Sequence, residues 1–446
     1  MPYIPHTPED QAAMLRVIGA AGTRELFADV PPETLFDAPP ALPPPRSEME
    51  VVAHVQALAA KNASTRTHIC LLGSGVYDHY VPGVIASLIS RSEFLTAYAP
   101  YQAEMSQGTL QTMFEYQTMI CRLTQMDIAN ASFYDGASAL AAAVAMCHRK
   151  EPGRRRVIVA HVPPAHQKVI RTYLAGFPLD LEFPAIGPAG LLDPETIAGD
   201  DLLAVAASCP NAVGAVPDMA SLSEAAHARG AFFIASIDPL SLGVLSTPGS
   251  YNADIAVGEA QCLGIPMNFG GPLLGLMAAK EAFLRLLPGR ISGQAADVDG
   301  RRGYVMTLQT REQHIRREKA TSNICSNQAL NALAACVYLA AVGRRGLTDV
   351  AEQCVHKANY LYRGIRAIPG WSAPYPDAPI FKEFAVRGPR PAVELAERAL
   401  KHGILLGVPA VDTTGDPRDL LIAVTEKRTR AELDRVLDVL RRECAA

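Results

Sequence analysis

The sequence predicts an α/β fold in which a large, mostly parallel sheet is sandwiched between helices. Short β-rich runs alternate with helical segments between residues 65 and 330. These runs are apolar throughout, as expected for strands that are covered on both faces. We therefore expect a helical N-terminal arm over residues 1–64, the large domain over 65–330, and a small α+β domain with its connecting helix over 331–446.

The composition excludes several classes of protein. With 49% hydrophobic residues, the chain of 446 residues is not wholly disordered. The net charge of −4 gives no sign of nucleic-acid binding. The longest apolar run, residues 139–147, is too short to span a membrane, and the first residues do not resemble a secretory signal. We therefore expect a cytoplasmic protein.

Neither a disulfide framework nor a metal site is expected. The nine cysteines are scattered without a C-x-x-C pair, which argues against disulfides and against structural zinc. Pro163 and Pro164 stand between His161 and His166 and prevent a simple helical pair of metal ligands.

The N-terminal arm reads as two helices with a proline-rich connection. Thr7 precedes a proline and two acids, which is typical of a helix start. Residues 38–46 carry five prolines and cannot form regular helix. Ser47 and Glu50 form a capping box for a helix that runs to about Lys61. The arm either wraps over the main body or a partner, or is a local helical cap.

The remaining elements follow from the apolar runs and the breaks between them. In the large domain we expect strands at residues 157–161, 179–183, 202–208, 231–237, 254–257 and 273–278, and helices at 167–175 and 222–229. In the C-terminal domain we expect helices at 331–343, at 391–402 and from 429 to about 444, and strands at 381–386, 404–406 and 420–424.

Two segments have features of a site for a phosphate and an aromatic ring. A turn that includes Gly136 and Ser138 leads into an alanine-rich helix, and free N–H groups at a helix start suit a phosphate. Asp238 ends a buried strand, where α/β proteins bind ligands, and an acid here can pair with a pyridinium nitrogen. The alternatives are an ordinary capped helix in the first case and a helix N-cap before Pro239 in the second.

A third segment carries a resemblance to a known family. Residues 252–264, followed by the Gly-Gly-Pro strand at 270–275, resemble the fold-type-I enzymes that use pyridoxal phosphate (PLP). Those enzymes place the lysine that binds PLP just after the first of these strands. Here the corresponding position, at about Gln261, holds no lysine, and the next lysine, Lys280, lies beyond the second strand. The resemblance therefore implies that this chain does not hold PLP covalently.

Longer motifs narrow the resemblance. They resemble the glycine dehydrogenase (decarboxylating) P-proteins of the glycine cleavage system. Because the lysine is missing, the chain resembles subunit 1 of the two-subunit forms. The resemblance covers the chain from the N-terminal arm to the C-terminal domain. The motifs are residues 73–80, 98–108, 114–120, 126–132 and 308–325.

The resemblance implies a heterotetrameric enzyme that is inactive without its partner. Subunit 2 would hold PLP, and the complex would decarboxylate glycine and pass the aminomethyl group to the lipoyl arm of H-protein. One alternative is a non-catalytic scaffold or regulatory protein with a degenerate PLP-binding fold. Another is a self-sufficient PLP enzyme that uses Lys280 or Lys319.

The resemblance also implies roles for two loops. Fold-type-I sites lie at subunit boundaries, and Thr321, followed by Ser322 and Asn323, looks like the loop that reaches the phosphate of the partner's PLP. The alternative is a capped turn before a helix at 324–339. Tyrosines suit a ring or a small carboxylate, so a second loop would face glycine or the lipoyl arm, or would only close the core. Its residues are Tyr98, Tyr101, Gln102 and Glu104.

Two further groups complete the candidate residues. A basic cluster would contact the partner subunit or H-protein, or would pair with Glu312 and Glu318 on a helix face. The cluster consists of Arg311, His314, Arg316 and Arg317. Asp238, Gly136 and Ser138 would then be the remnant of a PLP site, which we expect to be empty or filled by side chains.

Overall fold

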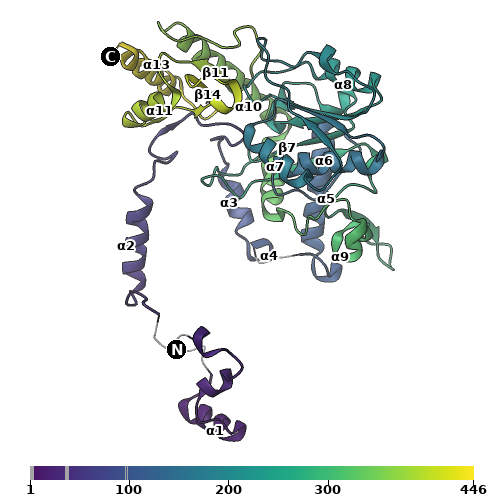
Figure 1. Ribbon diagram of the computed structural model, residues 1–446, viewed down its shortest axis with the longest axis vertical. Coiled ribbons are helices and arrows are strands. Elements are labelled where there is room, and N and C mark those ends of the chain that lie inside the picture. Colours follow the sequence, from purple (N-terminus) through teal and green to yellow (C-terminus); the bar gives the residue numbers. More distant parts are fainter. Residues whose placement is uncertain (1–4, 36–39, 96, 98, 446) are drawn as a thin grey trace. The chain divides into compact units, whose positions relative to one another are not determined.

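The computed structural model describes residues 5–35, 40–95, 97 and 99–445, with side chains of the last helix described up to residue 442 (Figure 1). The chain divides into two compact units, Met1–Ala63 and Ser64–Ala446. The domain boundary that the sequence suggests near residue 330 stays a prediction.

The first unit contains helices α1 (Pro8–Ile18) and α2 (Glu48–Ala59). Thr7 and Ser47 begin them through capping boxes, as predicted, because each hydroxyl and the acid three residues later bond to each other's backbone N–H. No described residue of either helix is buried. Among the described residues between the helices, 3₁₀ turns lie at Thr23–Phe27 and Pro32–Thr34.

The second unit is built on a seven-stranded sheet in the order β2-β8-β7-β6-β5-β3-β4. Strands β3 to β7 are parallel to one another, whereas β8 is antiparallel to β7 and β2 is antiparallel to β8. The mostly parallel sheet is therefore confirmed, with an antiparallel edge. The strands are β2 (Ile128–Ala129), β3 (Arg156–Ala160), β4 (Asp180–Glu182), β5 (Leu202–Cys209), β6 (Phe232–Ile237), β7 (Ile255–Glu259) and β8 (Gly275–Ala279).

Helices cover both faces of this sheet. Successive strand residues point to opposite faces, so Val157 packs in the core under α6 and α7, whereas Ile158 packs in the core under α5, α8 and α10. This double cover explains why the central strands are mostly apolar, whereas the edge strand β4 carries the exposed acids Asp180 and Glu182. The helices are α5 (Gln107–Thr124), α6 (Gly136–Lys150), α7 (Pro164–Leu174), α8 (Met219–Ala228) and α10 (Ala329–Arg366).

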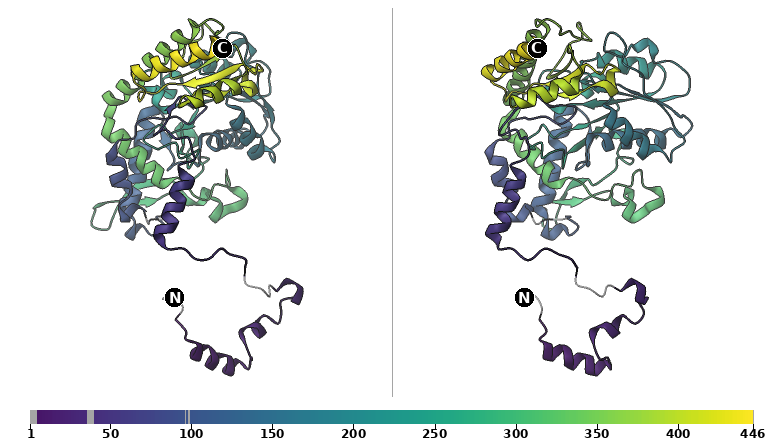
Figure 2. Two further views of the ribbon diagram at one scale, coloured as in Figure 1. Left: turned by 90° about the vertical axis from the view of Figure 1, so that its left-hand side faces the viewer. Right: turned by 60° about the vertical axis from the view of Figure 1, so that its left-hand side comes forward.

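Helix α10 extends from the sheet to the C-terminal strands. It is broken at Gly343, whose φ of 60° and ψ of −175° are not helical. Its second half packs with β11, β14 and α13 around a separate core, and these C-terminal elements lie together at one end of the second unit (Figure 2). The elements here are β11 (Glu383–Arg387), α11 (Ala392–Lys401), β12 (Ile404–Leu405), β13 (Val408–Pro409), β14 (Asp419–Ala423) and α13 (Arg430–Ala445).

Shorter elements join these layers. Strand β1 pairs with β12, so residues near 70 lie beside the C-terminal strands. No helix among the described residues is long and apolar enough to cross a lipid bilayer. These elements are β1 (Ile69–Cys70), α3 (Gly83–Ile89), α4 (Ser92–Leu95), β9 (Ser292–Ala296), β10 (Arg302–Met306), α9 (Gln313–Arg316) and α12 (Val411–Thr414).

Candidate active site

A small cavity lies at the carboxyl ends of β6 and β7, where open α/β sheets bind their ligands. Asp238 follows β6, and Glu259 is the last residue of β7. The cavity has a volume of about 60 Å³, which holds a few water molecules and not a pyridine ring with a phosphate. Side chains from several separate segments fill the space around it.

The start of α6 holds a carboxyl group of the chain itself. Glu259 Oε2 accepts a hydrogen bond of 3.0 Å from the N–H of Gly136, and the Asp135 side chain accepts one of 2.8 Å from the N–H of Ser138. A Cβ on Gly136 would lie 2.8 Å from the backbone nitrogen of Glu259, so only glycine allows this approach. Both N–H groups that the sequence offered to a phosphate are therefore already bonded.

Glu259 is held by backbone groups on three sides. Its Oε1 accepts hydrogen bonds from the N–H groups of Gln261 (3.0 Å) and Leu274 (2.9 Å). Burial raises the pKa of Glu259 to about 7, and the N–H donors oppose this rise, while nearby Asp135 adds to it. The carboxyl group thus ionises close to neutral pH.

Asp238 pairs with a lysine that the sequence analysis did not single out. Lys382 Nζ lies 2.5 Å from Asp238 Oδ2, 2.9 Å from His79 Nε2 and 3.7 Å from the centre of the Tyr77 ring. Burial opposes the charge of Lys382, but Asp238 and two neighbouring thiols hold its pKa above the usual value. Asp238 Oδ1 also accepts from the N–H of Leu240, so the expected N-cap is present as well.

Glu383, the neighbour of Lys382, fixes the loop that follows β1. It accepts hydrogen bonds from the N–H of Ser74 (2.6 Å) and the hydroxyl of Tyr77 (3.0 Å). A Cβ on Gly73 would lie 2.0 Å from Glu383 Oε1, so this loop passes too close for a larger residue. Burial raises the pKa of Glu383 to about 7.

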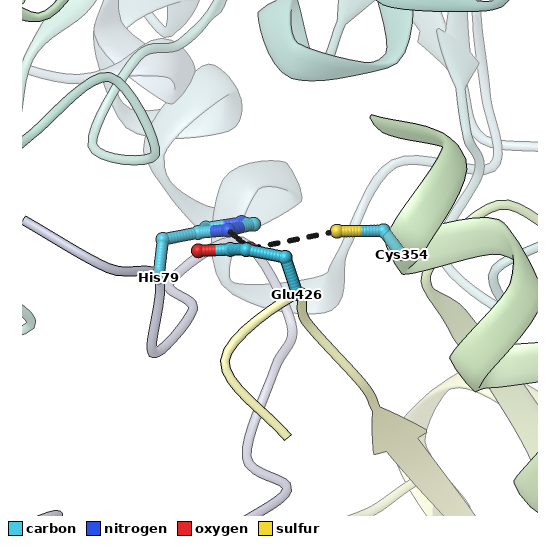
Figure 3. Close-up of side chains that lie close together, drawn as sticks. All are labelled: His79, Cys354 and Glu426. Atoms are coloured by element: carbon cyan, nitrogen blue, oxygen red, sulfur yellow. Dashed lines mark hydrogen bonds and ion pairs between the residues drawn. The ribbon is translucent and has the colours of Figure 1, made fainter. Parts of the chain in front are cut away.

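His79, Glu426 and Cys354 lie close enough together to suggest a metal site (Figure 3). His79 Nδ1 is 2.6 Å from Glu426 Oε2, and Cys354 Sγ is 3.6 Å from the same oxygen. However, the Lys382 ammonium can only donate, so His79 Nε2 accepts from it and Nδ1 carries the proton that bonds Glu426. Burial lowers the pKa of His79 and raises that of the Cys354 thiol. A neutral thiol, a protonated Nδ1 and an adjacent ammonium oppose a metal cation.

Gln261, at about the position expected for the PLP lysine, is fully bonded within the chain. Its side-chain amide accepts from the N–H of Tyr77 and donates to the carbonyls of Tyr77 and Ile265. Lys280 pairs instead with Asp254, 2.7 Å away, which precedes β7. It therefore lies at the opposite end of β7 from Glu259, away from the cavity.

Thr321, Ser322 and Asn323 line a second, open groove of about 590 Å³ beside α6 and α7. Thr321 is buried, and within the described residues its hydroxyl makes no hydrogen bond, whereas Ser322 Oγ accepts from the N–H of Ile324. Arg149 and Arg317 also line the groove. Neither arginine forms an ion pair with any carboxylate of the described residues.

The alternative helix at 324–339 is wrong at its start, whereas helix α10 begins at Ala329, close to the expected start at 331. Residues before it are held in an extended path by other contacts. The N–H groups of Cys325 and Ser326 bond to the hydroxyl of Tyr134, and Ser132 Oγ accepts from the N–H of Gln328. The loop and groove are thus fixed by the segment that precedes α6.

Arg290 joins the tyrosine loop to the segment before α10. Its guanidinium donates to the Tyr101 hydroxyl (3.1 Å), to Asn327 Oδ1 (3.1 Å) and to the carbonyl of Cys325 (3.4 Å). Arg290 is buried, and no carboxylate of the described residues pairs with it. Tyr98 lies outside the described residues, while Tyr101, Gln102 and Glu104 are exposed.

The predicted basic cluster does not form one helix face. Arg311 is half-buried and donates to the carbonyls of Leu308 and Gly289, and burial lowers its pKa. His314 Nδ1 lies 3.8 Å from a carboxylate oxygen of buried Glu312. The other two, Arg316 and Arg317, are exposed at the end of the four-residue helix α9 and after it. A helix this short cannot align all four side chains.

Three further candidates are two histidines and a lysine. His161 Nε2 is 3.3 Å from the carbonyl of Ala185, whereas His166, in α7, lines the cavity. Burial lowers the pKa of both histidines. Lys319 is exposed at the end of a 3₁₀ turn, Arg317–Lys319.

Comparison with known proteins identifies the family. The model of the glycine cleavage system P-protein family matches residues 1–440. The chain belongs to this P-protein family. It is 47% identical to the probable glycine dehydrogenase (decarboxylating) subunit 1 of Chlorobium limicola, over 99% of both chains. It is 46% identical to the protein of the same name from Thermomicrobium roseum, over the full length of both.

Solved structures agree with this assignment. The crystal structure of glycine decarboxylase (P-protein) of the glycine cleavage system, in inhibitor-bound form, matches with a TM-score of 0.90 and 44% identity, over 99% of this chain and 100% of that one. A sphingosine-1-phosphate lyase from Burkholderia pseudomallei K96243 shares the fold at 14% identity, with a TM-score of 0.67 over 93% and 94%. The expected fold class is thus confirmed. The chain is a subunit of a glycine-decarboxylating enzyme, and the scaffold alternative is not favoured.

The residues that sequence reasoning missed in this P-protein chain are Glu259, Lys382 and Glu383. Lys382 and Glu383 stand in the segment at 381–386 that the sequence predicts to be a strand, and two charges within a mostly apolar run indicate buried partners. Glu259 was quoted within the motif at 252–264, but nothing in the sequence gave its distance from the start of α6.

The buried carboxyl of Glu259 makes the stability of this P-protein chain depend on pH. The folded chain keeps the Glu259 proton up to about pH 7, whereas the unfolded chain loses it near 4.5. The unfolded state therefore binds fewer protons, and the free energy of unfolding falls as pH rises from about 4.5 to 7, by up to about 3 kcal/mol. We expect Glu259→Gln to remove this contribution to the pH dependence of the free energy of unfolding, measured by urea unfolding at pH 5, 6 and 7.

Glu383 provides a second, similar slope that remains in Glu259→Gln, since burial also raises its pKa to about 7. The control is Glu151→Gln, which alters an exposed carboxyl and should leave the slope unchanged. An unchanged slope in Glu259→Gln would contradict the assignment of this titration to Glu259.

Arg290 should hold two loops of the P-protein chain at once. We expect Arg290→Met to speed amide hydrogen exchange at residues 99–105 and 325–328 by tenfold or more, because three hydrogen bonds are lost. Arg290→Lys should recover part of the protection, since an ammonium cannot reproduce the planar fork. The control is Arg285→Met, at an exposed position. Equal exchange in all these variants would show that Arg290 does not join the loops.

Proposed function

We propose that this chain is the subunit without a PLP lysine, and that subunit 2 of the complex holds PLP covalently. The observation that carries this proposal is the state of the cavity at β6 and β7. Glu259 accepts the hydrogen bond of the Gly136 N–H, and Lys382 forms an ion pair with Asp238. Gln261 offers no amine. The residues present therefore do not fit covalent PLP in this chain, and we derive no step at this cavity.

The open groove suits the phosphate of a PLP held by the partner. PLP supplies the electron sink for loss of carbon dioxide from glycine. The role of this chain is to bind and orient. The Thr321 hydroxyl, with Ser322 and Asn323, offers donors on one wall, and Arg149 and Arg317 bring positive charge that no carboxylate of the described chain neutralises.

The tyrosine loop is proposed to face glycine or the lipoyl arm of H-protein. Tyr101, Gln102 and Glu104 are exposed and offer hydroxyl, amide and carboxylate groups, and Tyr98, outside the described residues, belongs to the same sequence loop. Support comes from Arg290, which ties Tyr101 to the segment between Thr321 and α10. Exposed Arg316 and Arg317 provide positive charge for the partner subunit or H-protein.

We further propose that the complex works in the cytoplasm. The eight cysteines whose side chains the structure describes are all free thiols. Free thiols suit a reducing compartment.

Reconstitution tests the proposed function. This chain, subunit 2, PLP and lipoylated H-protein should together exchange bicarbonate with the carboxyl group of glycine, and either subunit without the other should not. The chain alone with PLP should show no absorbance of lysine-bound PLP. Such absorbance from the chain alone would overturn the placement of PLP on subunit 2.

Thr321→Ala should weaken the binding of PLP to the reconstituted complex. Loss of one hydrogen bond to a charged group costs about 1.5–3 kcal/mol, so the Kd for PLP should rise about tenfold or more. Thr321→Ser keeps the hydroxyl and should stay within about threefold. The control is Thr348→Ala, where the hydroxyl bonds only its own helix. If Thr321→Ala leaves the Kd unchanged while the complex remains active, the partnership holds and the role of Thr321 does not.

A further inference from the structure

We propose that this chain carries its own substitutes for both charged ends of the cofactor, Glu259 for the phosphate and Lys382 for the pyridinium. Both side chains line the same cavity at the carboxyl ends of β6 and β7. The inference extends the proposed function to the cavity that PLP does not use. Its tests need no turnover and no subunit 2, so its failure is distinct from failure of the proposed function.

The phosphate end rests on the start of α6. This helix has fifteen residues, and the N–H of its first residue, Gly136, donates to a carboxyl group where phosphate-binding proteins hold a phosphate. The carboxyl group is that of Glu259, which also accepts from two further N–H groups and ionises close to neutral pH. Gly136 leaves space for this approach because a Cβ would meet Glu259. The surroundings are therefore built for a buried anion with several N–H donors.

The pyridinium end rests on Asp238. An acid at the end of this strand can pair with a ring nitrogen that carries a proton, and here the Lys382 ammonium lies 2.5 Å from its Oδ2. Lys382 is 1% exposed, so it has no role as an ordinary surface cation. Its ammonium also lies over the Tyr77 ring, which favours a cation at this point.

Together these contacts join two parts of the second unit at the cavity. Lys382 directly precedes β11 and Glu383 begins it, whereas Asp238 directly follows β6 and Glu259 ends β7. Glu383 also holds the loop that contains Ser74 and Tyr77. Charged groups of the chain thus connect elements that a cofactor bound in the cavity would otherwise connect.

The first test uses Glu259→Ala and inorganic phosphate. The full-length chain is melted at pH 8, where phosphate is a dianion, with 0–50 mM phosphate at constant ionic strength. We expect the variant to melt below the unaltered chain and to regain at least half of the lost Tm as phosphate rises. The matched control is Asp218→Ala, because Asp218 also accepts from backbone N–H groups at a helix start but is not in the cavity.

Saturable recovery of Glu259→Ala alone supports the proposal. Equal stabilisation of Glu259→Ala, Asp218→Ala and the unaltered chain would be a general salt effect and would overturn it. If Glu259→Ala does not fold without phosphate, refolding yield becomes the measurement. A higher yield with 50 mM phosphate supports the proposal, and no folding under either condition overturns it.

The second test uses both substitutes and a cofactor analogue without an aldehyde. Pyridoxine 5′-phosphate cannot react with surface lysines, and its binding is measured by calorimetry at pH 7.5. Glu259→Ala/Lys382→Ala frees the α6 start and Asp238 together, so we expect it to bind at least tenfold more tightly than the unaltered chain. Adding Asp238→Asn should remove most of this gain. Equal affinity in the double variant and the unaltered chain would overturn the proposal.

Discussion

The ion pair between Lys382 and Asp238 is the contact on which this part of the molecule depends. A buried ammonium is costly unless its charge and its hydrogen bonds are satisfied. Asp238 supplies the charge, His79 supplies an acceptor, and the Tyr77 ring lies beneath. These partners come from the large sheet and from the loop after β1, while Lys382 precedes β11. Satisfying one charge therefore fixes three distant segments relative to one another.

Much of the fold could be predicted from the sequence because burial leaves a local pattern. The runs at β5 and β6 are apolar on both faces, and the helices of the arm begin at visible capping boxes. Strand direction leaves no such pattern. Strand β8 is as apolar as its neighbours although it runs antiparallel to β7, so its place was predicted and its direction was not. The expected helix at 331–343 begins close to the start of α10, whereas the alternative start at residue 324 was wrong, because contacts with Tyr134 and Ser132 hold that segment extended.

The candidate site was less predictable, because its contacts join residues far apart in the sequence. Glu259 reaches Gly136 across 123 positions, and Lys382 reaches His79 across 303. The sequence indicated the acid and the turn because each has features of a ligand site, and it indicated the missing lysine because that position departs from a family motif. It did not indicate which side chains fill the cavity, because a charged residue within a strand does not show which distant residue it contacts.

The two cavities differ in how their charges are balanced, and this difference separates their roles. In the small cavity, Asp238 has a cation and Glu259 has three N–H donors, so an incoming anion or ring would have to displace internal contacts. In the open groove, Arg149 and Arg317 have no anionic partner among the described residues, and the Thr321 hydroxyl is unused. Unbalanced charge that stays solvated can accept an anion at little cost. This difference supports the proposal that the groove contributes to a site completed by another subunit.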